Sequence, residues 1–223
     1  MPFLPPIDRE AALPAALGAT PAAVALLAGR RRTATALLAL PAALALFFRD
    51  PERSADVAEV PVDEVRAPAD GRVMYVGPVQ PEVAVGLDPE VDWQQVSIFL
   101  SVFNVHINRA PYAGVVESVS YRPGNWHAAY RYESAFENER SDIVVSRSVA
   151  GQQRRYVVRQ IVGLLARRVV TRIEAGDTLA TGERIGLMKF GSRMDVFLPP
   201  EVELSVGQGA RVVAGESVIA RWK

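Results

Sequence analysis

The sequence has 223 residues, of which 49% are hydrophobic, and its 25 acidic side chains balance its 25 lysines and arginines. This length suits one compact domain with an appendage, and the zero net charge argues against a general nucleic-acid-binding protein, so no nucleic-acid partner is expected. The absence of cysteine excludes disulfides, thiolate zinc sites and cysteine nucleophiles, and two histidines, His106 and His127, are little material for a metal site, so none is predicted.

The N-terminal segment, residues 1–48, differs in composition from the rest of the chain. Residues 11–29 and 33–48 carry no charge and are rich in Ala and Leu, and three arginines at 30–32 separate them. A helix that spans a bilayer needs about 20 apolar residues, so the first segment is near that length and the second is short. Three prolines are expected to bend these helices: Pro14, Pro21 and Pro41.

Three interpretations compete for this segment. A cleaved signal peptide fits poorly, because Asp8, Arg9 and Glu10 do not form a basic leader and a second apolar segment follows. A buried helical hairpin of a soluble protein is the plainer alternative. We expect a helical hairpin in or on a membrane, because the three arginines suit a cytoplasmic turn or a contact with anionic headgroups.

Residues 49–223 are predicted to form one β-rich domain. Short segments rich in β-branched and aromatic residues, bounded by Gly, Pro and Asp, are expected as strands at 72–76, 96–102, 114–121 and 156–158. Residues 160–173 are interpreted as buried strands, although their pattern also allows a helix, and residues 125–141 as a long loop with some helix.

The C-terminal part contains an internal repeat. Residues 173–187 and 206–220 share single apolar residues separated by glycines at fixed spacing, which suits tight turns between short strands. This unit resembles the half-motif of lipoyl- and biotinyl-carrier domains, and residues 67–73 resemble the opening strand of such a domain. The expected fold is therefore mainly β, with a barrel-sandwich-hybrid-like core and an N-terminal apolar helical hairpin.

The stretch MKFGSRMDVF, residues 188–197, allows three functional interpretations. Lys189 would carry biotin or lipoyl in a carrier domain, and Ser192 would be the nucleophile of a membrane-associated serine hydrolase. In the third interpretation, the Ser192 hydroxyl attacks the preceding carbonyl, which Gly191 leaves accessible because it has no Cβ.

The third interpretation requires a base to activate the hydroxyl and a carboxylate to orient that base. The sequence offers His106 and Asp70 for these roles. Each also has an ordinary structural explanation, since a histidine among apolar residues is commonly a core residue and an aspartate before glycine commonly forms a turn.

Six blocks occur in the order found in one known family: 49–53 (RDPER), 67–71 (APADG), 104–111 (NVHINRAP), 137–140 (ENER), 158–168 (VRQIVGLLARR) and 190–199 (FGSRMDVFLP). With these blocks the chain, from about residue 45 onward, resembles the short form of the phosphatidylserine decarboxylase proenzyme family. The resemblance implies a self-cleaving zymogen and lyase of phospholipid biosynthesis.

The resemblance implies autocatalytic cleavage between Gly191 and Ser192, with Asp70, His106 and Ser192 as the catalytic residues of that step. The products would be a β chain, 1–191, and an α chain, 192–223, which begins with a covalent pyruvoyl cofactor derived from Ser192. The pyruvoyl group would then form a Schiff base with the amine of phosphatidylserine, release CO2 and yield phosphatidylethanolamine.

The implied partners are phosphatidylserine, membrane lipid and the chain's own cleavage product in a β–α heterodimer, with a higher oligomer also allowed. The implied location is the cell membrane, peripheral or hairpin-anchored, with the catalytic domain on the cytoplasmic face. Longer family members carry a second histidine, assigned to decarboxylation, where this chain has Phe103. In this chain His106, His127 or a water would have to assist decarboxylation. Arg167 and Arg168 are interpreted as surface charges or as contacts for the lipid phosphate.

Overall fold

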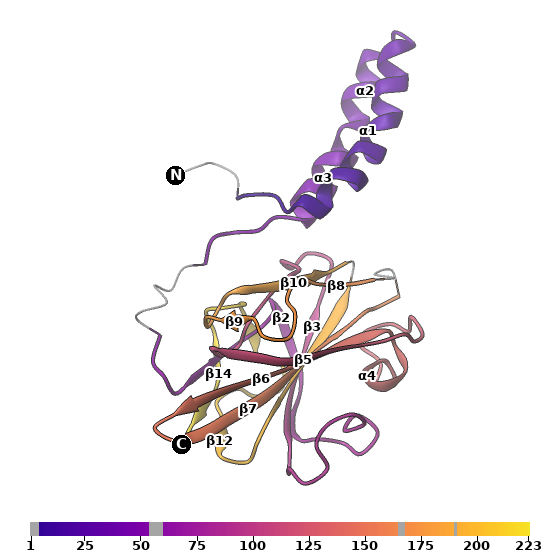
Figure 1. Cartoon of the computed structure of the whole chain (residues 1–223). Helices are drawn as coiled ribbons and strands as arrows, with labels where there is room; N and C mark the ends of the chain where they lie inside the picture. The colour runs from indigo at the N-terminus through magenta and orange to yellow at the C-terminus, as the bar shows by residue number, and fades with distance from the viewer. Residues whose placement is uncertain (1–4, 54–59, 165–167, 190) are drawn as a thin grey trace. The chain divides into compact units, whose positions relative to one another are not determined.

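A computed structural model describes residues 5–53, 60–164, 168–189 and 191–223 (Figure 1). The chain divides into two compact units, Met1–Glu52 and Arg53–Lys223, and each is described by itself.

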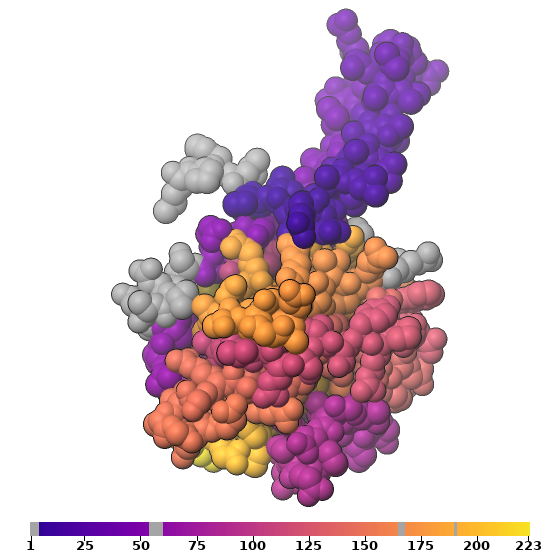
Figure 2. All heavy atoms as spheres, in the orientation of Figure 1, coloured from indigo at the N-terminus to yellow at the C-terminus, as the bar shows by residue number. Residues whose placement is uncertain are grey.

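The first unit consists of two helical stretches that lie side by side (Figures 1 and 2). A short 3-10 helix precedes the first stretch and the second is in two parts: η1 Arg9–Ala11, α1 Ala12–Leu27, α2 Arg31–Leu37 and α3 Ala39–Phe47. Gly29 turns the chain between the stretches with a φ of +73°, in the left-handed region that favours glycine. A backbone bridge between Ile7 and Arg49 closes the base of this hairpin.

The prolines act differently in the two stretches. The second stretch is interrupted at Leu38, three residues before Pro41, whose ring removes a helix hydrogen bond, so the expected break is present there. In contrast, α1 is a single helix that contains Pro21.

The second unit is mainly β, as expected, and its described residues include one short helix. Its elements are β1 Glu64–Arg66, β2 Gly71–Pro78, β3 Gln94–Leu100, β4 Ile107–Arg109, β5 Gly114–Arg122, α4 Ser134–Glu137, β6 Arg140–Val149, β7 Gln152–Ile161, β8 Val169–Thr171, β9 Thr178–Leu179, β10 Arg184–Met188, β11 Ser192–Leu198, β12 Val202–Leu204, β13 Arg211–Val212 and β14 Val218–Trp222. An eight-stranded antiparallel sheet has the order β13-β2-β3-β11-β7-β6-β5-β9, and two three-stranded sheets have the orders β1-β14-β12 and β4-β10-β8.

The four segments predicted as strands correspond to β2, β3, β5 and β7, so these strands are confirmed, although β3 ends at Leu100, two residues before the predicted end at 102. The stretch 125–141 contains α4 within a long connection before β6, as expected. The ambiguous run 160–173 is strand only near its ends, in β7 and β8, and residues 165–167 lie outside the described residues.

The two glycine repeats found in the sequence adopt the same structure. Each consists of a two-residue strand, a turn and a five-residue strand: β9 and β10 in the first copy, β13 and β14 in the second. Gly182 and Gly215 occupy equivalent turns with φ of +84° and +76°. The turns also contact each other, since a Cβ on Gly182 would lie 3.8 Å from the Cα of Gly215.

A second pair of equivalent segments supports these turns. RAPADG begins at Arg66 and RAPYAG begins at Arg109, and each connects a three-residue strand to a long strand of the large sheet. The guanidinium of Arg66 donates to the carbonyl of Gly215 at 3.1 Å, and that of Arg109 donates to the carbonyl of Gly182 at 2.9 Å. The core of the β unit is therefore built from two similar halves.

Strand β11 lies in the middle of the large sheet, between β3 and β7, and all seven of its residues are buried. Side chains alternate between the two faces of a strand. Met194, Val196 and Leu198 contribute to the main core, whereas Phe197 packs in a smaller cluster with Val83, Trp93 and Val157. The same alternation places Ser192 on the main-core side of β11.

Candidate active site

The peptide bond between Gly191 and Ser192 lies in the connection from β10 to β11. β10 pairs with β4 and β8, whereas β11 pairs with β3 and β7, so the two flanks of this bond are held in different sheets. Ser192 is fully buried and pairs with Leu100 at the end of β3. Gly191 has a φ of +73°, which an L-residue with a side chain would adopt only under strain.

His106 lies beside this bond. Its carbonyl accepts a hydrogen bond from the Met188 N–H at 3.2 Å, so the last residue of β10 is tied to it. Its Nδ1 lies 3.0 Å from the carbonyl oxygen of Asn104, and because a carbonyl only accepts, Nδ1 is assigned the proton. In the neutral imidazole Nε2 is then an acceptor, and it lies 3.4 Å from the amide nitrogen of Gly191, whose N–H points at it.

The Ser192 hydroxyl lies on the same connection, where it donates a long hydrogen bond of 3.5 Å to the carbonyl of Lys189. The structure therefore brings Ser192, Gly191 and His106 together, three of the four residues that the sequence assigns to cleavage. In this tautomer Nε2 is the acceptor of the imidazole, and it faces the amide of the residue that precedes Ser192. This arrangement can remove a proton at the Gly191–Ser192 bond.

Asp70, the fourth residue, is held by other partners. Its carboxylate forms a bidentate ion pair with Arg53, in which Nη2 lies 2.8 Å from Oδ2, and it accepts from the Ala214 N–H at 2.9 Å. It precedes β2, which is separated from β11 by β3. Two strand spacings amount to about 10 Å, so Asp70 does not contact Ser192 directly.

A family model described as phosphatidylserine decarboxylase matches residues 40–220 of the chain. The phosphatidylserine decarboxylase proenzyme of Solibacter usitatus is 43% identical over 211 residues, which cover 92% of this chain and 91% of the relative. The proenzymes of Nitrobacter winogradskyi and Beijerinckia indica are 45% and 46% identical, and these matches cover 80% and 79% of this chain and 70% and 72% of the relatives. The chain belongs to the phosphatidylserine decarboxylase family.

Family membership confirms the resemblance drawn from the six sequence blocks, including the short form of the proenzyme. It also decides between the three interpretations of residues 188–197. The interpretation as a self-cleaving decarboxylase is retained. The other two interpretations, a carrier domain modified at Lys189 and a serine hydrolase acting on other molecules, are rejected.

Gly163, which no sequence pattern singles out, lies against the Gly191–Ser192 bond. A Cβ built on Gly163 would lie 1.9 Å from the carbonyl oxygen of Gly191 and 3.0 Å from its carbonyl carbon. Gly163 belongs to the block 158–168, but the spacing of that block does not indicate which element it meets. Only the tertiary structure shows that it faces the peptide bond.

The residues after Ser192 form a buried charged network on the opposite face of β11. Arg193 Nε donates to the Asp195 carboxylate at 2.8 Å, and Arg193 Nη2 donates to the Ser97 hydroxyl at 3.1 Å. Gln95 donates to the other carboxylate oxygen at 3.1 Å. These contacts place Arg193 in the interior of the protein.

The other residues considered for decarboxylation lie elsewhere. Phe103 follows β3 on a turn and its side chain is 83% exposed. His127 Nε2 lies 2.9 Å from a carboxylate oxygen of Glu137. Arg168 is exposed, and Arg167 lies outside the described residues. Within the described ranges, no three His, Asp or Glu side chains gather as metal ligands.

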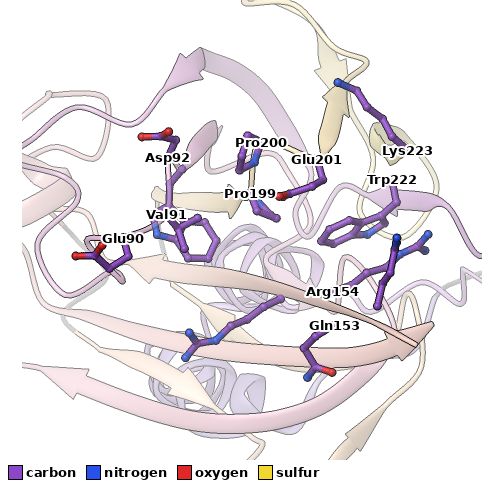
Figure 3. Close-up of a pocket in the computed structure, with 13 residues that line it drawn as sticks. Glu90, Val91, Asp92, Gln153, Arg154, Pro199, Pro200, Glu201, Trp222 and Lys223 are labelled. Atoms are coloured by element: carbon purple, nitrogen blue, oxygen red, sulfur yellow. The ribbon is translucent and has the colours of Figure 1, made fainter. Parts of the chain in front are cut away.

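A pocket lies at the far end of β11, where Pro199 and Pro200 follow the strand (Figure 3). The strand is seven residues long, so this pocket is about 20 Å from Ser192. Arg154, one of its lining residues, already donates to the Tyr112 hydroxyl and stacks 5.2 Å from the ring centroid of Trp222. The pocket is therefore separate from the reaction centre.

Proposed function

We propose that this phosphatidylserine decarboxylase proenzyme cuts itself between Gly191 and Ser192. The observation that supports this most directly is the His106 Nε2 acceptor, 3.4 Å from the Gly191 nitrogen and one residue from the buried Ser192 hydroxyl. Serine is activated when a general base comes within hydrogen-bond reach of its hydroxyl, and the proposal requires Ser192 Oγ to leave the Lys189 carbonyl for His106 Nε2, since catalytic contacts are often long at rest and tighten as the reaction proceeds.

The proposed cleavage has two stages. In the first, Ser192 Oγ gives its proton to His106 Nε2 and attacks the carbonyl carbon of Gly191. The C–N bond then breaks, and the Ser192 nitrogen takes up a proton, so an ester replaces the amide. Gly191 suits this stage because it has no Cβ to block the attack.

In the second stage, loss of the Ser192 α-proton expels Gly191 as the carboxylate that ends the β chain. This leaves dehydroalanine at the start of the α chain, and its reaction with water releases ammonia and forms the pyruvoyl group. The resulting ketone supplies the electron sink for decarboxylation. The residues fit this chemistry, since the group forms from Ser192 at the fixed start of a central strand, beside His106.

Asp70 is proposed to support His106 from a distance. Its carboxylate lies among Arg53 and the Ala214 amide in the structure, and Nδ1 of His106 is oriented by the Asn104 carbonyl. We therefore propose Asp70 as a positioning residue, because the hydrogen bonds described for its carboxylate go to Arg53 and Ala214 and those described for the imidazole go to Asn104 and Gly191.

Cleavage also gives access to the reaction centre. Ser192 is fully buried in the intact chain, so the serine headgroup of a lipid cannot reach it. Breaking the Gly191–Ser192 bond frees the end of the segment that follows β10. We infer that this freed end moves aside and admits the headgroup.

The substrate is phosphatidylserine, and the family's lyase reaction yields phosphatidylethanolamine and CO2. The first unit provides the membrane contact that we propose for this lipid substrate. Residues Arg9–Leu27 form one helical stretch that is long and apolar enough to cross a bilayer. The second stretch is shorter and interrupted, so we propose a hairpin anchor that does not cross the bilayer, or peripheral attachment, at the cell membrane, with the three arginines on anionic headgroups and the catalytic unit on the cytoplasmic face.

The core of the β unit is proposed to be a barrel-sandwich hybrid. Its support is the similarity of the two halves, in which the turns at Gly182 and Gly215 contact each other and receive equivalent arginine hydrogen bonds. In this proposal the carrier-like repeat reflects fold ancestry, and Lys189 carries no modification.

The test is the chain pattern of the purified protein. The wild-type chain should give two fragments that end at Gly191 and begin at Ser192, with a pyruvoyl blocking group on the smaller one in its intact mass. Ser192→Ala should give one chain of 24.2 kDa without decarboxylase activity. Cleavage of Ser192→Ala at the same bond would contradict the serine mechanism.

A second variant tests the base. His106→Ala should slow fragment formation by about 10²- to 10⁴-fold, the usual contribution of a general base. His127→Ala is the matched control, because its imidazole lies on Glu137 and should leave processing unchanged. Equal processing rates in both variants would assign His106 a structural role only.

A further inference from the structure

Gly163 occupies an unusual position relative to the bond that is cut. The heavy atom nearest to its hypothetical Cβ is the carbonyl oxygen of Gly191, at 1.9 Å, which is far closer than real Cβ atoms approach any atom. The carbonyl carbon that Ser192 attacks is 3.0 Å away. The scissile carbonyl therefore rests directly on the backbone of Gly163.

The backbone conformation of Gly163 does not explain the glycine. Its φ lies outside the left-handed region, unlike that of Gly191, so an L-residue could adopt the same backbone. A side chain is excluded because there is no room for its Cβ. The obstructing atoms belong to the backbone, so a rotamer change cannot relieve the overlap.

Both sides of this contact are held in place. On one side, Val162, the residue before Gly163, is held by two hydrogen bonds. Its N–H donates to the Glu139 carbonyl at 3.1 Å, and the Val162 carbonyl accepts from the buried Asn138 side chain at 2.8 Å. On the other side, Ser192 is paired within the large sheet and the Gly191 N–H points at His106. An added methyl group would have to displace one of these fixed segments by about 1 Å.

We propose that Gly163 is a positioning residue for self-cleavage. Only a residue without a Cβ at this position leaves room for the Gly191 carbonyl at the place where the Ser192 hydroxyl can attack it and His106 can take up the proton. This inference rests on the proposed cleavage at Gly191–Ser192. A misplacement of about 1 Å in a reacting group can cost about 10²-fold in rate. Gly163→Ala should slow fragment formation by this order of magnitude.

The main experiment follows the formation of the two fragments over time in Gly163→Ala and in a matched control, Gly207→Ala. Gly207 has no described heavy atom within 4 Å of its hypothetical Cβ and no left-handed φ, so the same substitution should be processed at the wild-type rate. Ser192→Ala is run alongside. If Ser192→Ala is cut, the proposed cleavage site is wrong; if it is intact but Gly163→Ala matures at the wild-type rate, only the role of Gly163 is wrong.

A second variant separates the carbonyl contact from ordinary packing. The next neighbour of the added Cβ is the Cβ of Ala129, at 3.3 Å. Adding Ala129→Gly to Gly163→Ala relieves this neighbour but leaves the overlap with the carbonyl, so maturation should stay slow. Recovery of wild-type maturation in the double variant would overturn the proposal.

A chemical readout locates the blocked stage. Hydroxylamine cuts a chain at an ester but not at an amide, so a precursor stalled after the acyl shift is cut between Gly191 and Ser192. Gly163→Ala should resist hydroxylamine as Ser192→Ala does, because the shift itself is impaired. Cutting of Gly163→Ala by hydroxylamine would show that the ester forms and would overturn the proposal.

Folding is checked in uncut chains, by comparing the thermal unfolding of Ser192→Ala with that of Gly163→Ala/Ser192→Ala. A cooperative transition in both supports a specific effect on cleavage. The proposal is overturned if Gly163→Ala/Ser192→Ala has no folded state and adding Ala129→Gly does not restore one. Gly163 would then be required for folding and not for positioning.

Discussion

At the residue scale, the two partners of the Asp70 ion pair can be separated by substitution. Asp70→Asn removes the carboxylate charge but keeps an acceptor for the Ala214 N–H, whereas Arg53→Gln breaks the same pair and keeps the carboxylate. If Asp70 supports His106, Asp70→Asn should slow maturation on the order of tenfold, less than the loss for a directly bonded aspartate, because Asn104 already orients the imidazole.

Maturation rates followed on denaturing gels check this prediction. Arg53→Gln should mature at close to the wild-type rate. Equal slowing of the two variants would instead assign the ion pair a structural role and remove Asp70 from the cleavage chemistry.

Arg193 presents a stability question at the same scale. Its guanidinium and the Asp195 carboxylate have side-chain exposures of only 4% and 0%. Arg193→Ala should lower the free energy of unfolding by about 3–5 kcal/mol, because it leaves a buried carboxylate without its countercharge. Urea denaturation of the uncleaved Ser192→Ala chain measures this loss.

A paired substitution provides the control for Arg193. Arg193→Met combined with Asp195→Leu removes both charges and should cost clearly less than Arg193→Ala alone, because no buried charge is left unpaired. A single substitution that costs less than the double one would show that the pair is not the stabilising feature.

At the element scale, α1 presents apolar side chains outward. Leu13, Leu17 and Leu27 are 69%, 64% and 89% exposed. Replacing Leu17, near the middle of the apolar stretch, and Leu27, at its end, by Glu should move the protein from the membrane pellet to the supernatant without detergent, since an acidic residue at the centre of a membrane helix costs about 2.5–3.5 kcal/mol.

Val85→Glu is the matched control for this test, because Val85 is 53% exposed but belongs to the β unit. It should leave the protein in the pellet, and both variants should still be cut into two chains. If the α1 variant stays in the pellet as Val85→Glu does, α1 is not the membrane contact.

At the scale of the whole molecule, cleavage leaves the two chains interlocked. The proposed α chain contains strands β11 to β14. Of these, β11 pairs with β3 and β7, β13 pairs with β2, and β14 pairs with β1, and all four partner strands belong to the proposed β chain. The mature enzyme should therefore elute as a β–α heterodimer in native size-exclusion chromatography and separate only when denatured. Elution of the small chain on its own under native conditions would contradict this expectation.

The positions of strands could be predicted from the sequence, whereas contacts between distant segments could not. Strand positions followed from β-branched runs bounded by turn residues, as β2, β3, β5 and β7 show. The glycine repeat indicated paired turns, whereas the RAPADG and RAPYAG segments carry no local signal that they are structurally equivalent. Their equivalence depends on hydrogen bonds to turns about 70 to 150 residues away in the chain.

The sequence by itself determined the family and pointed to the Gly191–Ser192 bond as the proposed cleavage site, because both inferences depend on ordered motifs and on the Gly-Ser pair, which are local properties of the chain. Only the tertiary structure placed His106 Nε2 at the Gly191 amide, tied Asp70 to Arg53 and seated the scissile carbonyl on Gly163. These contacts join residues from 17 to 85 positions apart. Such distances are set by how the sheets pair and pack, and no local pattern encodes them.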